Sequence, residues 1–165
     1  MNPSDLWAIS PILVLVGWAC ILILVDLFIP RDRKAWTALL AAVGLIITMV
    51  ISVSQAGQTR VAFNGMVVVD GFASFLVLVF AGSGLIGILL AYDYLKRLQI
   101  ERGEYYTILL FSISGMLLMA VSADLIMIFL SLELLSIPLY VLAGFAGERP
   151  SSEESALKYF LMGAF

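Results

Sequence analysis

The chain has 165 residues, of which 62% are hydrophobic and 13% are charged, and its formal net charge is −3. Soluble domains are typically about 45–50% apolar, so this composition indicates an integral membrane protein that contacts the lipid bilayer. The few Lys and Arg residues are dispersed, which excludes a basic surface for nucleic acid. With no histidine and only one cysteine, Cys20, the chain alone cannot build a disulfide or a zinc or iron–sulfur site.

The apolar stretches predict the fold class, because a helix needs about 20 mostly apolar residues to cross a bilayer. We expect an all-α, multi-pass transmembrane bundle with five full helices and the start of a sixth. Asp70, Asp124 and Ser151 are expected to mark helix starts. The full helices are predicted over residues 6–29, 36–54, 71–92, 105–122 and 125–145, and the sixth from about Ser152.

Two shorter patterns lie between and within these helices. Residues 60–69 contain two β-prone runs around Asn64-Gly65, which predicts either a small outer hairpin with a type I′ turn or an irregular loop. Ser83, Gly87 and Ala91 recur every four residues, a spacing of small side chains that favours close helix packing in lipid.

The basic residues predict the orientation of the helices. They follow the first, third and fifth helices, and the opposite side carries only Arg60. By the positive-inside rule, the N-terminus lies outside and these three loops lie in the cytoplasm or its equivalent. The basic residues on the inner side are Arg31, Arg33, Lys34, Lys96, Arg97, Arg102 and Arg149.

Glu133 is the main candidate for chemistry, because it lies near the middle of the fifth apolar run. The helical rise places it roughly 13 Å from Asp124, in a hydrocarbon layer about 30 Å thick. An ionisable group at that depth suggests a path for protons or ions. Ser136 and Tyr140 follow on the same side of the helix, and Pro138 leaves a backbone carbonyl free beside Glu133. A structural role for Glu133, as a hydrogen-bonding group between helices, remains the alternative.

Lys158 is the available cation for this carboxylate. We count the depth of Lys158 in the membrane from the start of the sixth helix. By this count Lys158 and Glu133 differ in height by only ~6 Å. Burial favours the neutral form of the Glu133 carboxyl, and a nearby cation favours its charged form. An approaching lysine would therefore favour release of the proton from Glu133. The alternative is a pair with Glu154, four residues earlier, or an amine that extends to the interface. Asp26, Asp93 and Asp124 lie near helix ends and are expected to be solvated.

The segments 131–144 (SLELLSIPLYVLAG) and 155–165 (SALKYFLMGAF) resemble the antiporter-like membrane subunits of respiratory complex I, most of all the subunit N branch. The resemblance implies a proton-pumping subunit without a redox centre, beside other membrane-arm subunits. NADH, flavin, iron–sulfur clusters and quinone are then expected in partner subunits. It also implies that Glu133 and Lys158 carry proton translocation, supported by Ser136, Pro138 and Tyr140.

The same family implies about fourteen helices in two inverted repeats, with a further lysine on a broken seventh helix, so we expect the sequence to be a fragment. Residues 1–104 would hold three N-terminal helices, and residues 105–165 the start of the proton-translocation module. The alternatives are a cation/proton antiporter subunit, a membrane-bound hydrogenase subunit, or a scaffold that transports nothing. A bacterial cytoplasmic membrane is the expected location, because no organelle-targeting segment is visible.

Overall fold

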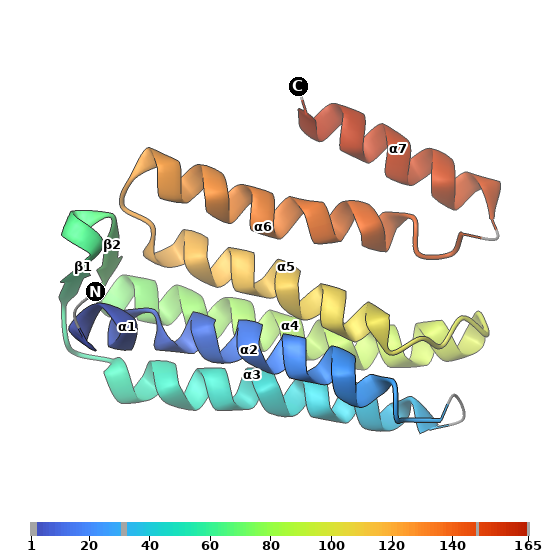
Figure 1. Cartoon of the computed structure of the whole chain (residues 1–165), viewed down its shortest axis with the longest axis horizontal. Coiled ribbons are helices and arrows are strands. Elements are labelled where there is room, and N and C mark those ends of the chain that lie inside the picture. Colours follow the sequence, from blue (N-terminus) through green and yellow to red (C-terminus); the bar gives the residue numbers. More distant parts are fainter. Residues whose placement is uncertain (1–2, 31–32, 148, 165) are drawn as a thin grey trace.

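The structure is a computed structural model that describes residues 3–30, 33–147 and 149–164. It is mostly helical, with one small hairpin (Figure 1). The helices in chain order are α1 (Pro3–Ala8), α2 (Ser10–Asp26), α3 (Ala35–Gln55), α4 (Gly71–Arg97), α5 (Glu104–Val121), α6 (Leu125–Ala143) and α7 (Pro150–Ala164). Between α3 and α4 lie strands β1 (Arg60–Ala62) and β2 (Val67–Val69), joined by a 3-10 turn, η2 (Phe63–Gly65).

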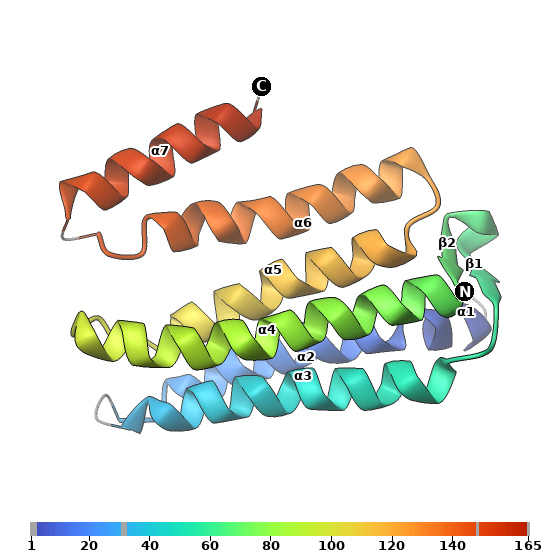
Figure 2. The same cartoon turned by 180° about the vertical axis from the view of Figure 1, so that it is seen from behind.

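Helices α2 to α5 form a four-helix bundle, and α6 and α7 extend it on one side. In the bundle α2 packs against α3 and α5, and α4 packs against the same two helices. Helix α6 packs on α5, and α7 packs on α6 as the outermost element (Figures 1 and 2). Most large apolar side chains of α6 and α7 are therefore exposed, whereas the buried core comes from α1 to α5 and the hairpin.

The membrane character expected from composition is confirmed. Four helices are long and apolar enough to cross a bilayer: α3, α4, α5 and α6. Helix α2 is a shorter apolar helix of 17 residues. The chain is thus a multi-pass membrane protein.

We expected the first apolar stretch to form one continuous helix. The structure instead breaks it at Ile9, between α1 and α2. Pro11 lacks the N–H that would bond to the carbonyl of Trp7. The Gln55 side chain at the end of α3 donates to that carbonyl at 2.6 Å and to Ser10 Oγ at 2.9 Å. The break is therefore held by a buried amide from another helix.

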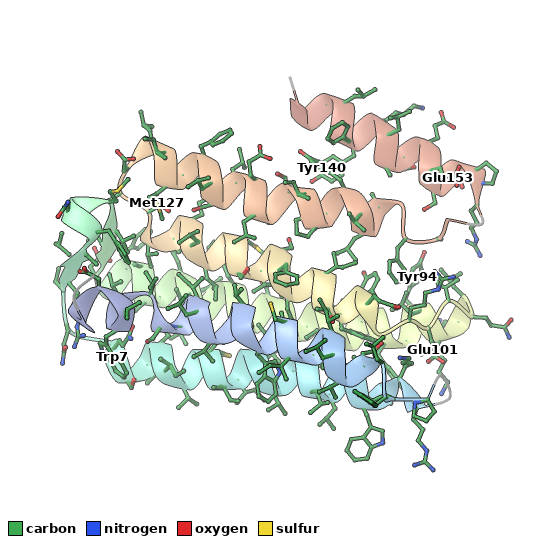
Figure 3. All side chains as sticks on the ribbon, in the orientation of Figure 1. Trp7, Tyr94, Glu101, Met127, Tyr140 and Glu153 are labelled. Atoms are coloured by element: carbon green, nitrogen blue, oxygen red, sulfur yellow. The ribbon has the colours of Figure 1, made fainter. Side chains whose placement is uncertain are left out.

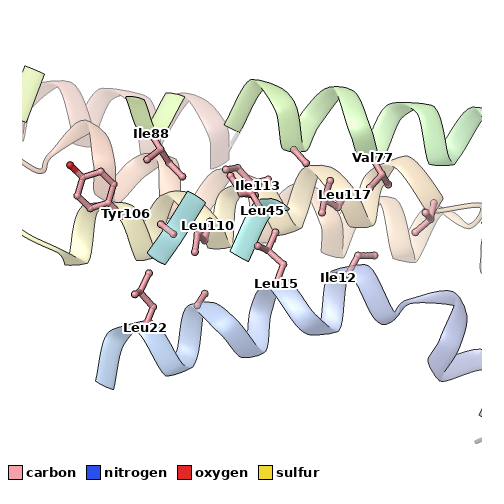
Figure 4. Packing of buried hydrophobic residues seen from close by; sticks show 14 of the residues in the cluster. Ile12, Leu15, Leu22, Leu45, Val77, Ile88, Tyr106, Leu110, Ile113 and Leu117 are labelled. Atoms are coloured by element: carbon pink, nitrogen blue, oxygen red, sulfur yellow. The ribbon is translucent and has the colours of Figure 1, made fainter. Parts of the chain in front are cut away.

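The core of the bundle is made mostly of aliphatic side chains, together with Tyr106, that are 0–7% exposed (Figure 4). Gly84 of α4 lies against Ile113. A methyl group added to Gly84 would also come 3.2 Å from the side chain of Leu45. Of the predicted small-residue stripe, Ala91 is buried, whereas Ser83 is exposed and nothing approaches Gly87 within 4 Å, so only Ala91 packs against the described residues. The buried side of α4 instead carries Val77, Ala81, Gly84, Ile88, Ala91 and Leu95.

The hairpin is confirmed: β1 pairs with β2 in antiparallel register, with Ala62 opposite Val67. At the turn, Asn64 has φ 55° and Gly65 has φ 92°, and the Met66 N–H donates to the Phe63 carbonyl at 3.1 Å. These positive φ values are those expected for Asn-Gly in a type I′ turn. Phe63 also has a positive φ, of 51°, which the sequence pattern did not indicate.

Two of the three predicted helix starts are confirmed. Asp70 Oδ1 accepts from Ala73 N at 2.7 Å, and Asp124 Oδ2 accepts from Ile126 N at 2.9 Å. Both carboxylates satisfy backbone N–H groups that a helix N-terminus leaves free. Ser151 lies inside α7 instead, because the helix begins at Pro150, whose fixed φ suits the first helical position.

Asp26 is buried rather than solvated, which corrects the expectation for this residue. It is 7% exposed, and its Oδ2 lies 2.7 Å from Lys34 Nζ. Thr37 Oγ1 donates to Oδ1 at 2.6 Å, and the backbone of Gly103 packs directly against the carboxylate. Lys34 and Gly103 cap α3 and α5, so Asp26 joins the end of α2 to the positive ends of two other helices. Of the inner basic residues, Arg31 lies outside the described part of the chain.

Candidate functional site

Glu133 lies within α6, nine residues after the capping residue Asp124. The helical rise gives ~13 Å between them, as expected for a carboxylate near the middle of a membrane span. The side chain is half-buried, and no hydrogen bond or ion pair joins it to the described residues. A carboxyl group at this depth is costly without a polar partner.

The side of α6 that packs on α5 is a seam of small and polar residues. A methyl group on Gly115 would come 2.7 Å from Leu135 Cα, so the two backbones are in close contact there. Ser112 Oγ donates to the Leu135 carbonyl at 3.1 Å, and Ser131, fully buried, lies 3.0 Å from Ser122 Oγ. Steps of about 100° per residue turn Glu133 roughly 160° away from Ser131 and Leu135. Glu133 therefore does not face α5.

Pro138 lies inside α6 without ending it. It cannot donate to the carbonyl of Leu134, so the helix has one hydrogen bond fewer in the turn after Glu133. The Ser112 hydroxyl of α5 binds the next carbonyl in the chain, that of Leu135. Ser136 Oγ donates to Leu132 O at 2.6 Å within α6. These two predicted supporting residues thus act on the α6 backbone in this arrangement.

Tyr140 links α6 to α7. Its ring makes edge-on contacts with Tyr159, at a centroid distance of 4.9 Å, and with Phe160, at 5.6 Å. Its hydroxyl lies against Gly163, where a side chain would clash (Figure 3). Glu133 and Tyr140 are seven residues apart, so they share one face of α6. Because Tyr140 contacts α7, Glu133 lies on the side of α6 toward which α7 runs.

Lys158 is not next to Glu133 in the structure. Its Nζ lies 2.5 Å from Glu154 Oε1, and both side chains are more than 60% exposed. A side chain on Gly144 would come 3.0 Å from Ala156 Cβ, so in these antiparallel helices Lys158 is about level with Leu142. That level is nine residues, or ~14 Å, from Glu133.

The sequence-based height difference of ~6 Å was therefore too small. That value assumed that the end of α6 and the start of α7 lie at the same level of the membrane. Helix α7 instead begins beyond the end of α6: Ser152 Oγ, near its start, still reaches the Ala143 carbonyl at 2.9 Å. Lys158 consequently lies near the end of the span.

Sequence reasoning missed the α5 residues that hold α6. Ser112 and Gly115 are spaced three apart on α5, a small-residue pattern that could have indicated the contact. In the described ranges, no three or more Cys, Asp or Glu side chains gather in a group that could hold a metal ion.

Comparison with known proteins defines the class. Residues 122–165, which include α6 and Glu133, match the family described as "NADH:quinone oxidoreductase/Mrp antiporter, TM". The chain is 46% identical to NADH-quinone oxidoreductase subunit N of Chloroflexus aggregans over 99% of its length and 34% of the relative's. It is 42% identical to subunit N 2 of Roseiflexus castenholzii, over 99% of the chain and 33% of the relative.

The fold agrees with these relatives. It matches a chain of the respiratory complex I from Thermus thermophilus with bound aureothin, with a TM-score of 0.76 and 28% identity. That match covers 93% of this chain and 33% of the other. The chain is therefore a homologue of part of NADH-quinone oxidoreductase subunit N, a membrane subunit of complex I. It spans about a third of the length of these relatives.

Proposed function

We propose that the chain is part of a proton-translocating membrane subunit of NADH–quinone oxidoreductase. Electron transfer from NADH to quinone would take place in partner subunits that hold flavin, iron–sulfur clusters and quinone. The observation that carries the proposal is Glu133, a half-buried carboxyl group at mid-span without a partner among the described residues, within the segment that matches the antiporter family. Ionisable groups inside spans are costly and mark proton paths.

Lys158 is proposed as the modulator of Glu133. In the arrangement described above it is paired with Glu154 and lies ~14 Å along the helix axis from Glu133, so modulation requires that the amine leave Glu154 and that a polar link or a shift of α7 along α6 bridge the remaining distance. The Lys–Glu pair is exposed, and such pairs contribute only ~0–1 kcal/mol, so little opposes this exchange. Pro138, Ser136 and Tyr140 would support it by leaving the α6 backbone adaptable and by holding α7 beside α6.

The test of Glu133 is the Glu133→Gln variant in an assembled complex in proteoliposomes. Proton pumping and NADH-to-quinone electron transfer are measured separately. We expect pumping to fall to a small fraction of wild type, because a neutral amide cannot carry a proton. Glu104→Gln is the matched control, because Glu104 is exposed in the first turn of α5. Full pumping by Glu133→Gln in an assembled complex would favour the scaffold that transports nothing.

The test of Lys158 compares Lys158→Met with Glu154→Gln. If the lysine serves Glu133, removing it lowers pumping, whereas removing its competitor Glu154 leaves pumping intact or raises it. If the two residues form only a structural pair, both variants have the same effect. Equal losses in the two variants would contradict the proposed modulation.

A second candidate function is a cation/proton antiporter subunit, because the matched family description names the Mrp antiporter as well. A membrane-bound hydrogenase subunit is the related alternative. Purification of the native protein with its partners distinguishes the three, since NADH-oxidising flavoprotein subunits accompany only the first.

We also propose partners, a membrane location and an orientation for the chain. The partners are the other membrane-arm subunits of complex I, and the location is a bacterial cytoplasmic membrane with the N-terminus outside. The dispersed basic residues support this orientation through the positive-inside rule. Residues 1–104 would form the three N-terminal helices, and residues 105–165 the beginning of the translocation module, of which 122–165 match the antiporter family.

A further inference from the structure

A cavity of about 290 Å³ lies at the end of the bundle where α4 ends, α5 begins and α6 turns into α7. A second cavity of about 210 Å³ shares several wall residues with it, among them Ile100, Phe145 and Arg149. Together they form one hollow between helices that is not close to Glu133. Tyr94 lies at this end, between α4 and the segment that joins α6 to α7 (Figure 3).

The apolar wall of the hollow is built by the end of α4. Gln99 has φ 57°, the Ile100 N–H donates to the Leu95 carbonyl at 3.2 Å, and the Gln99 N–H donates to Lys96 O. This is a Schellman motif, which folds the chain back onto the last helical turn. Leu95 and Ile100 consequently line the cavity together. On the other side, Phe145 packs edge-on against Tyr105 at a centroid distance of 5.1 Å.

The polar wall carries positive charge and hydroxyl groups. Arg149 lines both cavities and Arg102 lines the second. Neither guanidinium has an ion-pair partner within the described ranges. Tyr94, Tyr105 and Ser151 also line the first cavity, and their hydroxyls donate to no described residue. Of the described acids near in sequence, Glu101, Glu104 and Glu153 are absent from the cavity walls, whereas Glu148, which precedes Arg149, lies outside the described residues.

Arginines that have no ion-pair partner among the described residues, beside hydroxyl-bearing side chains, match the oxygens of a phosphate group, which Arg binds in a forked geometry. The surrounding surface indicates where that phosphate comes from. Ile86, Leu90 and Tyr94 are each at least 60% exposed and recur every four residues, so they form one lipid-facing stripe along α4. This stripe leads from the span to Tyr94 at the edge of the hollow. An acyl chain can lie along it while the headgroup occupies the polar wall.

We propose that the hollow between the end of α4, the start of α5 and the α6–α7 segment binds the phosphate headgroup of an anionic phospholipid, through Arg102 and Arg149. Basic pockets between transmembrane helices at a membrane surface suit such headgroups. The bound lipid would bridge α4 and α5 to α7, which touches no helix of the bundle extensively. Lipid binding at this place is independent of whether Glu133 carries protons.

The test is site-directed photocross-linking in the full-length protein within its native complex. A benzophenone amino acid at position 94 reports on the hollow, and the probe is headgroup-labelled phosphatidylglycerol in phosphatidylcholine vesicles. We expect Arg102→Gln/Arg149→Gln to lower labelling about tenfold or more, since each lost charge-assisted contact is worth up to about tenfold in affinity. Arg97→Gln is the matched control, because Arg97 is exposed, paired with Asp93 and outside both cavities.

Two further arms make the outcome decisive. Labelling by phosphatidylcholine should depend much less on the two arginines, because its choline cation offsets the charge of the phosphate. Millimolar inorganic phosphate should not reduce labelling by phosphatidylglycerol. The proposal is overturned if the double variant is labelled as strongly as wild type, or if Arg97→Gln loses as much labelling. Competition by inorganic phosphate would show a soluble anion site and would equally overturn it. Circular dichroism of the double variant checks that it is folded.

Discussion

The buried charge of Asp26 leads to a quantitative prediction. In the Asp26→Asn variant the shape of the side chain is kept but its charge is lost. The Lys34 amine, which is 2.7 Å from the carboxylate in wild type, then remains buried without a counter-charge. The amine keeps its 3.1 Å contact with the backbone carbonyl of residue 26, and the Asn amide oxygen can accept a hydrogen bond from it but carries no charge.

The magnitude follows from burial. The side chains of Asp26 and Lys34 are 9% and 11% exposed, so solvent screens the pair very little. Removing one partner of a buried ion pair typically costs ~3–5 kcal/mol, because the other charge remains desolvated. We expect a loss of free energy of unfolding in this range. The Asp93–Arg97 pair is the matched control: its side chains are 63% and 76% exposed, so Asp93→Asn should cost no more than ~0–1 kcal/mol.

The assay is reversible unfolding in mixed detergent micelles, followed by circular dichroism, for wild type and both Asn variants. A Lys34→Met variant and the Asp26→Asn/Lys34→Met double variant complete a double-mutant cycle. The double variant should lose less than the sum of the single changes, because it buries no lone amine. If Asp26→Asn costs no more than Asp93→Asn, the pair is solvated in the membrane and the reasoning from burial is refuted.

Three further changes test individual contacts, all by the same unfolding assay. Gly115→Ala should destabilise the protein by several kcal/mol, because the added methyl group meets the backbone of α6. Gly87→Ala is the control and should be close to neutral, because its methyl group meets no atom within 4 Å. Equal effects of the two changes would contradict the α5–α6 contact. Gln55→Leu should cost about 1–3 kcal/mol by leaving the Trp7 carbonyl unbonded, and an unchanged stability would show that water replaces the amide. Gly65→Ala should cost about 1–2 kcal/mol because φ is 92° there, and a neutral result would mean that the turn relaxes.

Several features of the fold could be predicted from the sequence because their causes are local. Apolar length alone identified the membrane helices, and Asp70 and Asp124 indicated helix starts through their own side-chain hydrogen bonds. Asn64-Gly65 indicated the turn, since positive φ is a property of these residues themselves. The depth of Glu133 needed only the helical rise and its distance from Asp124.

The tertiary structure decided which groups meet. In a mostly apolar chain, hydrophobic periodicity does not distinguish a lipid-facing side from a core-facing side, so the packed side of α4 could not be predicted. Asp26 looked like a residue at a solvated helix end until α3 and α5 enclosed it. The separation of Lys158 from Glu133 depends on where α7 begins relative to α6, and a connecting segment of a few residues sets that offset. Depth is a property of one helix, whereas proximity belongs to the packing of two.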